Sequence, residues 1–185
     1  MLIARRHPVI RLVATLAVIA TVAPALQTLH ALQAQGVRAR LGAWIEPVLL
    51  DTLRQDFQVA APPAKVYDAA LRAFAALDIP TGTTDGKAGI IGSDRFERSH
   101  VLVGSPMSRS FSCGEGATGE YANSFRVDIV VVVWVAPQGD GTKLGVATAA
   151  SARDMSGEAR SSKRCASTGT LEQKLFERIT KLVTP

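Results

Sequence analysis

The sequence predicts an α+β fold: a two-layer sandwich in which two helices cover one face of an antiparallel sheet, preceded by one N-terminal transmembrane or signal helix. Three observations lead to this class. An apolar run follows clustered arginines near the N-terminus, two long β-rich segments flank a turn, and two segments repeat apolar residues every three or four positions. We divide the chain into an anchor or signal peptide (1–35), a membrane-surface linker (36–55) and a periplasmic α+β domain (56–185).

The first 35 residues carry an export pattern. Three arginines precede an uncharged apolar run over 12–26. The candidate membrane-anchor residues in this run are Leu12, Leu16, Ile19 and Leu26. A helix over 8–32 would be about 37 Å long and would cross a hydrocarbon core of about 30 Å. Ala23-Pro24-Ala25 also offers small residues to signal peptidase, so the segment is either a retained span or a cleaved signal.

Residues 36–55 mix basic and aromatic side chains with apolar ones. Arg38, Arg40 and Trp44 stand beside Leu41 and Ile45, a combination typical of segments that lie at a lipid headgroup surface. These first three residues are the candidate interfacial residues. The alternative is an ordinary linker whose apolar residues dock on the following domain.

The first elements of the predicted domain are short. A strand over 57–59 is stopped by two prolines, and a helix with one apolar face begins at Ala64. The composition of 81–86 predicts a turn. Strands are expected over 88–96 and 101–103.

The most pronounced strand pattern is a pair of β-rich runs over 124–135 and 142–152, joined by turn residues over 137–141. This pattern predicts an antiparallel hairpin. Because 130–133 is apolar on both faces, we expect the outer face of the sheet to be covered as well. Thr170 is predicted to cap the last helix with Gln173 as its capping-box partner. The buried stripe of that helix would be Leu171, Leu175, Ile179 and Leu182.

The charge distribution argues against a nucleic-acid partner. Lys and Arg number 21 and Asp and Glu number 16, which gives a net charge of +5. Residues 1–50 hold five Arg and one Glu, so most of the excess belongs to the N-terminal segment. A nucleic-acid binder would need a basic face on the folded body, and we expect none.

Cys113 and Cys165 are the two cysteines of the sequence. An exported chain meets an oxidising compartment, so we expect them to form a disulfide. Closing a loop of about fifty residues would contribute about 4 kcal/mol in the chain-entropy treatment.

No residue set points to catalysis, a cofactor or a metal. Residues 114–119 match the glycine pattern of dinucleotide-binding loops, but the element expected next is a strand rather than a helix. The three histidines lie far apart, and Asp94 with Glu97 stands beside arginines as a solvated charge cluster. We therefore expect a protein without enzymatic activity, cofactor or metal.

Ser112-Cys113-Gly114 and the run Cys165-Ala-Ser-Thr-Gly-Thr-Leu-Glu172 carry a resemblance. They resemble a group of small bacterial envelope α+β domains with a Cys-Gly loop and a Cys-x-Ser-Thr-Gly-x-Leu-Glu helix start. The resemblance covers residues 56–185 and implies an envelope domain without known catalytic residues. The layout is also similar to helix-grip-like accessory domains of outer-membrane assembly lipoproteins, although no lipid-bearing cysteine follows the apolar run.

These expectations converge on a non-catalytic accessory subunit of a bacterial inner-membrane complex. Its N-terminus would be cytoplasmic, its domain periplasmic, and its partners other membrane-protein subunits and the lipid bilayer. A photosynthetic reaction-centre or light-harvesting assembly is favoured because His30 would lie among pigment-binding helices. The alternative is a cleaved, soluble periplasmic module that holds a hydrophobic ligand between helices and sheet.

Overall fold

A computed structural model describes residues 36–117, 119–154 and 162–184, which belong to one compact unit. The candidate anchor residues Leu12, Leu16, Ile19 and Leu26, together with His30, lie outside the described residues. Within the described part, no helix combines the length and apolar character needed to cross a membrane. The elements in chain order are β1 (Arg38–Ala39), β2 (Val48–Leu49), the 3-10 helix η1 (Leu50–Leu53), β3 (Gln55–Val59), α2 (Pro63–Ala76), β4 (Thr81–Asp85), β5 (Ile90–Ser93), β6 (Phe96–Ser99), β7 (Val101–Leu102), β8 (Ser105–Pro106), the 3-10 helix η2 (Met107–Arg109), β9 (Phe111–Ser112), β10 (Glu115–Gly116), β11 (Gly119–Glu120), α3 (Tyr121–Ser124), β12 (Arg126–Gln138), β13 (Gly141–Arg153), β14 (Ser162–Ser167) and α4 (Thr170–Val183).

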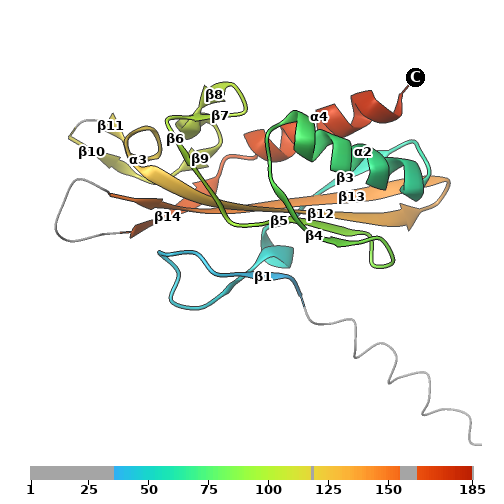
Figure 1. The fold of residues 1–185 in the computed structure, drawn as a ribbon, viewed down its shortest axis with the longest axis horizontal. Coiled ribbons are helices and arrows are strands. Elements are labelled where there is room, and N and C mark those ends of the chain that lie inside the picture. The colour runs from blue at the N-terminus through green and yellow to red at the C-terminus, as the bar shows by residue number, and fades with distance from the viewer. Residues whose placement is uncertain (1–35, 118, 155–161, 185) are drawn as a thin grey trace, which may run out of the picture. The chain divides into compact units, whose positions relative to one another are not determined.

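The main sheet of the described chain is antiparallel and eight-stranded, so the predicted α+β class is confirmed at this level. Its strand order is β4-β5-β12-β13-β14-β9, and β6 and β3 add to β12 and β13 respectively. The long hairpin β12–β13 forms the centre (Figure 1). The predicted hairpin is therefore confirmed. Pairing extends to Gln138 and Gly141, which leaves a two-residue turn shorter than the predicted one.

The predicted turn over 81–86 is wrong, because Thr81–Asp85 is strand β4 at the edge of the sheet. All five of its residues are exposed. An edge strand that is solvated on both faces shows no apolar alternation, and its polar composition therefore mimics a turn. The turn itself comes later, where Asp85 Oδ1 accepts hydrogen bonds from the backbone N–H groups of Lys87 and Ala88 at 2.9 Å each.

The strand predicted over 88–96 is two strands that pair with different parts of β12. Strand β5 pairs with Val132–Trp134 and β6 pairs with 126–129. Between these registers, the backbone N–H of Val131 donates to Ser93 Oγ at 2.8 Å. A side-chain hydroxyl thus replaces the missing ladder bond, as a buried backbone donor requires.

Helices α2 and α4 pack on each other and on the central hairpin, both on one face of the sheet (Figure 1). Pro63 occupies the start of α2, where its missing N–H costs no hydrogen bond. The predicted stripe of α4 is confirmed for its first three members, which are fully buried, and Leu182 is half-buried. We call this helix-covered side the inner face.

The predicted capping box at the start of α4 is wrong. Thr170 is the first helical residue, and the N-cap is Gly169, whose φ of 84° lies in the left-handed region that glycine adopts without strain. The Gln173 side chain donates to Glu177 Oε1 instead of reaching back to the cap. Ser167 Oγ accepts the Gly169 N–H at 3.1 Å and so ties the entry of the helix.

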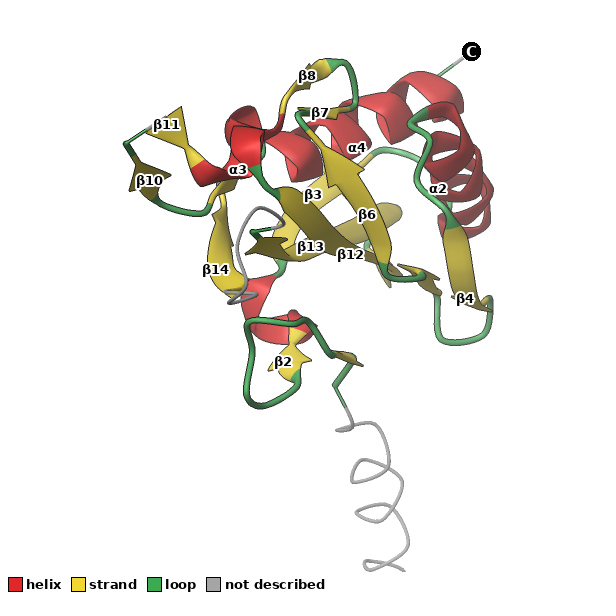
Figure 2. Cartoon of the chain, turned by 60° about the vertical axis from the view of Figure 1, so that its left-hand side comes forward, coloured by secondary structure: helices red, strands yellow, loops and turns green. Residues whose placement is uncertain are grey.

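The opposite side of the sheet, which we call the outer face, is covered by residues 36–53. Leu41, Val48 and Leu50 are buried against Val130 and Val132 in a second apolar cluster. Figure 2 shows β2 and η1 on the side of the sheet away from α2 and α4. The predicted cover of the outer face is confirmed, and the segment expected as a linker docks on the domain, as the alternative interpretation held.

Candidate functional site

The edge of β13 that faces β3 and β14 is interrupted. Strand β3 pairs with Thr142–Val146 and β14 pairs with Ala150–Arg153, so no described strand lies opposite 147–149 on this edge. Thr148 is paired with Val131 of β12. The N–H of Val131 points away from Thr148, because it donates to Ser93 Oγ on the other side of β12. Because backbone groups alternate along an antiparallel strand, the N–H and C=O of Thr148 point into the interruption. We call this interruption the sheet break.

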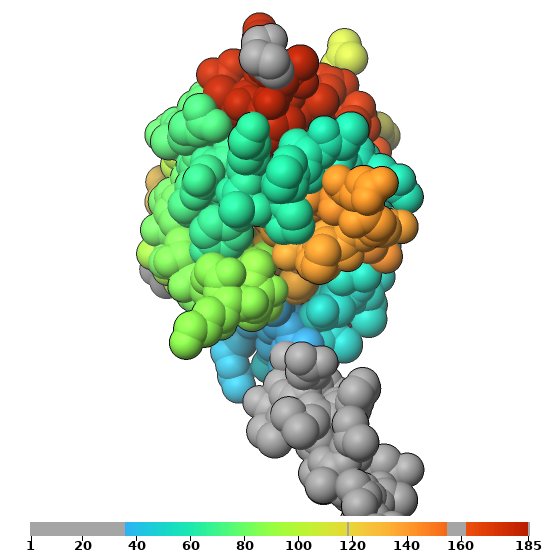
Figure 3. Space-filling view, turned by 90° about the vertical axis from the view of Figure 1, so that its right-hand side faces the viewer, coloured from blue at the N-terminus to red at the C-terminus, as the bar shows by residue number. Residues whose placement is uncertain are grey.

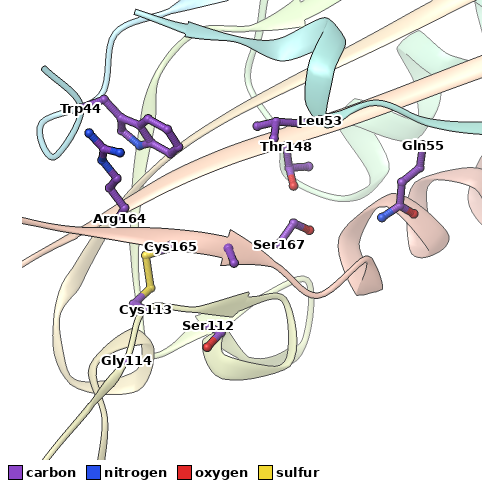
Figure 4. A pocket seen from close by; sticks show the side chains of 11 residues that line it. Trp44, Leu53, Gln55, Ser112, Cys113, Gly114, Thr148, Arg164, Cys165 and Ser167 are labelled. Atoms are coloured by element: carbon purple, nitrogen blue, oxygen red, sulfur yellow. A yellow bond between two sulfur atoms is a disulfide. The ribbon is translucent and has the colours of Figure 1, made fainter. Parts of the chain in front are cut away.

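A pocket of about 570 Å³ opens at the sheet break (Figure 4). Its size is within the range of ligand-binding pockets in proteins. It brings together five separate parts of the chain: the segment before β2, the end of η1 with the start of β3, the end of β9 with the loop that follows it, the middle of β13, and strand β14. The lining residues are Trp44, Leu53, Gln55, Ser112, Cys113, Gly114, Thr148, Arg164, Cys165, Ala166 and Ser167.

A buried carboxylate lies behind this lining. Glu172, in the first turn of α4, is 1% exposed, and its Oε1 accepts hydrogen bonds from Thr148 Oγ1 at 2.5 Å and Ser167 Oγ at 2.7 Å. Its other oxygen, Oε2, is buried without a hydrogen-bond partner among the described residues. The two hydroxyls and the positive end of the helix dipole compensate the charge. The network holds α4, β13 and β14 together directly beneath the pocket.

The pocket rim carries an aromatic ring and a cation. The Arg164 guanidinium lies 4.6 Å from the centre of the Trp44 ring, and its Nε donates to the Ala43 carbonyl at 3.2 Å. Trp44 Nε1 is buried without a hydrogen-bond partner in the described part of the chain. Figure 4 shows this pair on the side of the pocket away from Gln55. Trp44, predicted at a membrane surface, is thus a rim residue of the pocket.

The disulfide forms one wall. Cys113 and Cys165 are bonded, with their Cα atoms 4.1 Å apart, so the predicted pairing is confirmed. The bond joins the loop after β9 to β14, next to the β9–β14 pairing. The resulting wall is therefore fixed covalently as well as by backbone hydrogen bonds.

A second hollow of about 400 Å³ lies on the outer face, between β1 and the β4–β5 hairpin. The predicted interfacial residues Arg38 and Arg40 are both part of its lining. We call it the outer groove. Asp94, predicted in one charge cluster with Glu97, also lines it, whereas Glu97 on β6 instead forms salt bridges with Arg126 and Arg153.

Asp128 is a buried carboxylate on the outer face, 5% exposed. Burial raises the pKa of Asp128 above its ordinary value, and nearby Glu97 raises it further. Arg153 and Arg95 lower it, but less than burial raises it. Its Oδ1 has no hydrogen-bond partner among the described residues. The neutral acid is therefore favoured here more than at an exposed aspartate.

Within the described residues, no cluster of three or more His, Cys, Asp and Glu could hold a metal ion. The glycine-rich stretch over 114–119 contains β10 and the first residue of β11, which pair as a small hairpin. The expectation that a strand comes next is wrong after β11, because α3, a helix of four residues, precedes β12. Sequence reasoning assigned no role in a site to Thr148, Ser167 or Glu172. Ser167 and Glu172 belong to the run over 165–172 that carries the resemblance, which implies no function for them, and Thr148 is one Thr within an Ala-rich strand.

The chain matches no protein-family profile and no curated protein sequence.

Proposed function

We propose that this protein is a non-catalytic binding subunit whose periplasmic domain receives a short, extended polypeptide segment of a partner at the sheet break. The observation that carries the proposal is the interrupted edge of β13: on the side that faces β3 and β14, no described strand pairs with Thr148, which lines the pocket there. Extended peptides bind proteins by adding backbone hydrogen bonds to such free strand positions, with side-chain pockets supplying specificity.

The dimensions restrict the bound segment. The break covers three strand positions, which corresponds to roughly 10 Å of extended chain. Strands β14 and β3 close it at either end, so a chain terminus or a tight loop fits better than a long strand. The terminal nitrogens of Arg164 beside the Trp44 ring favour an acidic group on the bound segment.

The cellular setting is part of the same proposal. The disulfide supports an oxidising compartment, because such bonds persist in the bacterial periplasm. Residues 1–35 would be the inner-membrane anchor, and the partner a subunit of a membrane complex, with photosynthetic assemblies the favoured class. The resemblance that the sequence suggests, to small bacterial envelope domains, supports the same compartment. A cleaved signal would instead give a soluble periplasmic form of the same binding domain.

The test uses the full-length protein and a displayed library of short random peptides. We expect enrichment of peptides with an acidic group. N-methylation of one central amide in a selected peptide should lower affinity by about tenfold or more, because it removes a backbone hydrogen bond to the edge of β13. Binding that tolerates N-methylation at every position would overturn the proposal.

A matched pair of variants locates the binding. Ala166→Leu fills the pocket from an exposed position on β14 and should abolish peptide binding. Ala75→Leu adds the same bulk at an exposed position of α2 and should leave affinity unchanged. Equal binding by both variants would place the peptide elsewhere on the surface.

A further inference from the structure

The outer groove has an apolar floor. Val130 and Val132 of β12, Ile90 of β5 and Leu50 of η1 line it, and no side chain rises from Gly92 between them. Figure 3 shows the two sides that bound it, where the green surface of the β4–β5 hairpin approaches the blue surface of the N-terminal segment. A volume of about 400 Å³ suits one small apolar molecule.

The rim of the outer groove is positively charged and unpaired. Arg38, Arg40 and Arg95 line it, and none of them forms a salt bridge within the described residues. By contrast, Arg54, Arg98, Arg126 and Arg153 each have a carboxylate partner.

Two carboxylates also line the outer groove, fewer than the three arginines. One of them, Asp85, already accepts hydrogen bonds from two backbone N–H groups of its own turn. Asp94 is the other, so three guanidinium groups stand against two carboxylates. The groove therefore combines an apolar floor with a net positive rim, whose arginines form no salt bridge in the described part of the chain.

We propose that the outer groove binds a single-chain anionic amphiphile as a monomeric ligand. The acyl chain would lie along the valines of β12, and a carboxylate or phosphate head would accept hydrogen bonds from the arginines. Burial of the chain supplies affinity, and the unpaired guanidinium groups select a negative head over a neutral one. This site is separate from the sheet break and does not depend on peptide binding there.

Gly92 offers a specific way to block the groove. A Cβ at this position would meet Val132 Cγ2 at 3.8 Å and Thr83 Cβ at 3.9 Å, which are ordinary van der Waals contacts. Its backbone does not have the positive φ that would strain another residue. Gly92→Val should therefore fold while occupying the space of the ligand.

The experiment measures binding of isotope-labelled dodecanoate to the full chain in nanodiscs of zwitterionic phosphatidylcholine, with empty nanodiscs as the partition baseline. We expect saturable binding above that baseline. Gly92→Val should abolish it, whereas Gly86→Val, in the nearby turn where a Cβ meets open space, should not. Unchanged binding by Gly92→Val would overturn the proposal.

The arginines are tested separately, because their exposed side chains carry no part of the core. Replacing both Arg38 and Arg40 by Gln should weaken dodecanoate binding by about tenfold, while Arg109→Gln, at an exposed arginine of η2, should have no effect. An uncharged dodecyl probe should bind weakly and be insensitive to both changes. Equal affinity for the charged and uncharged probes would contradict the assigned role of the arginines. The protein should bind monomeric dodecanoate but should not bind intact anionic vesicles through this groove. Binding to anionic vesicles without any binding of monomeric dodecanoate would also contradict the proposal.

Discussion

At the scale of single residues, the buried carboxylate of Glu172 shows how the pocket is supported. A buried charge is tolerated when donors surround it, and here two hydroxyls and the start of α4 serve that purpose. Sequence reasoning predicted the stripe that begins at Leu171 but not the buried Glu172. Helical periodicity identifies apolar faces, but it does not identify the hydrogen-bond partners of a polar residue. The partners of Glu172 are Thr148 on β13 and Ser167 on β14, which lie outside its own helix.

Thr148→Val tests this network. The change preserves side-chain shape but removes a donor to a buried carboxylate, so we expect the free energy of unfolding to fall by about 1.5–3 kcal/mol. Thr142→Val is the matched control on the same strand: its hydroxyl donates to the neutral carbonyl of Ala61, and its loss should cost about 0.5–1.5 kcal/mol. Urea unfolding of both variants measures the two costs. A cheaper loss at Thr148 than at Thr142 would contradict the charge-assisted interpretation.

The buried carboxyl group of Asp128 should make the free energy of unfolding depend on pH. Because its folded-state pKa is raised, the folded chain binds a proton more tightly than the unfolded chain does. Its contribution to the free energy of unfolding is therefore greatest below the ordinary pKa of about 4 and falls as pH rises through the folded-state value. Asp128→Asn should unfold at higher urea than the wild type at about pH 7, with a smaller difference toward about pH 3. A difference that is independent of pH would count against this account.

At the scale of elements, the sequence predicts those whose pattern is local. Helix α4 and the β12–β13 hairpin show their periodicity within one segment, and both are confirmed. Strand β4 was missed because an exposed edge strand needs no apolar face. The cover of the outer face was expected, but the segment that supplies it, residues 36–53, was not identified as that cover. Its few apolar residues are compatible with a position at a membrane surface as well as with docking on the domain.

Because residues 36–53 pack on the outer face, we expect them to contribute to the free energy of unfolding of the domain. Leu50 of η1 is fully buried on the outer face, so Leu50→Ala should lower the free energy of unfolding by about 2–5 kcal/mol. Leu53, in the same turn, is 39% exposed, and the same substitution there should cost clearly less. Thermal or urea unfolding of the two variants compares them. Two equally small costs would show that residues 36–53 do not belong to the folded unit.

At the scale of the whole molecule, the sheet break illustrates what sequence reasoning could not reach. Trp44, Gln55, Thr148 and Arg164 meet there although up to 120 positions separate them, and their meeting depends on where β14 leaves β13 and β3 begins. The disulfide could be predicted because a chain with two cysteines allows only one intramolecular pairing. The pocket beside it was not, because register is a property of paired strands rather than of one segment.

The proposed membrane anchor is tested on the protein isolated from native membranes. We expect an intact mass that includes residues 1–35, recovered in the membrane fraction. A chain that begins at about Leu26 and is recovered in the soluble fraction would replace the tethered subunit with a soluble periplasmic one. The proposed peptide and amphiphile sites would be unaffected by that outcome, because the residues that line both hollows lie within the described domain.

The most direct test of the central claim is amide hydrogen exchange at Thr148, with and without a selected peptide. In the free protein we expect Thr148 to exchange faster than Val146 and Ala150, which pair with β3 and β14 on the same edge. Bound peptide should slow exchange at Thr148 while leaving those two neighbours unchanged. A Thr148 amide that is already as protected as its neighbours in the free protein would contradict an open edge, and with it the proposed binding of an extended segment.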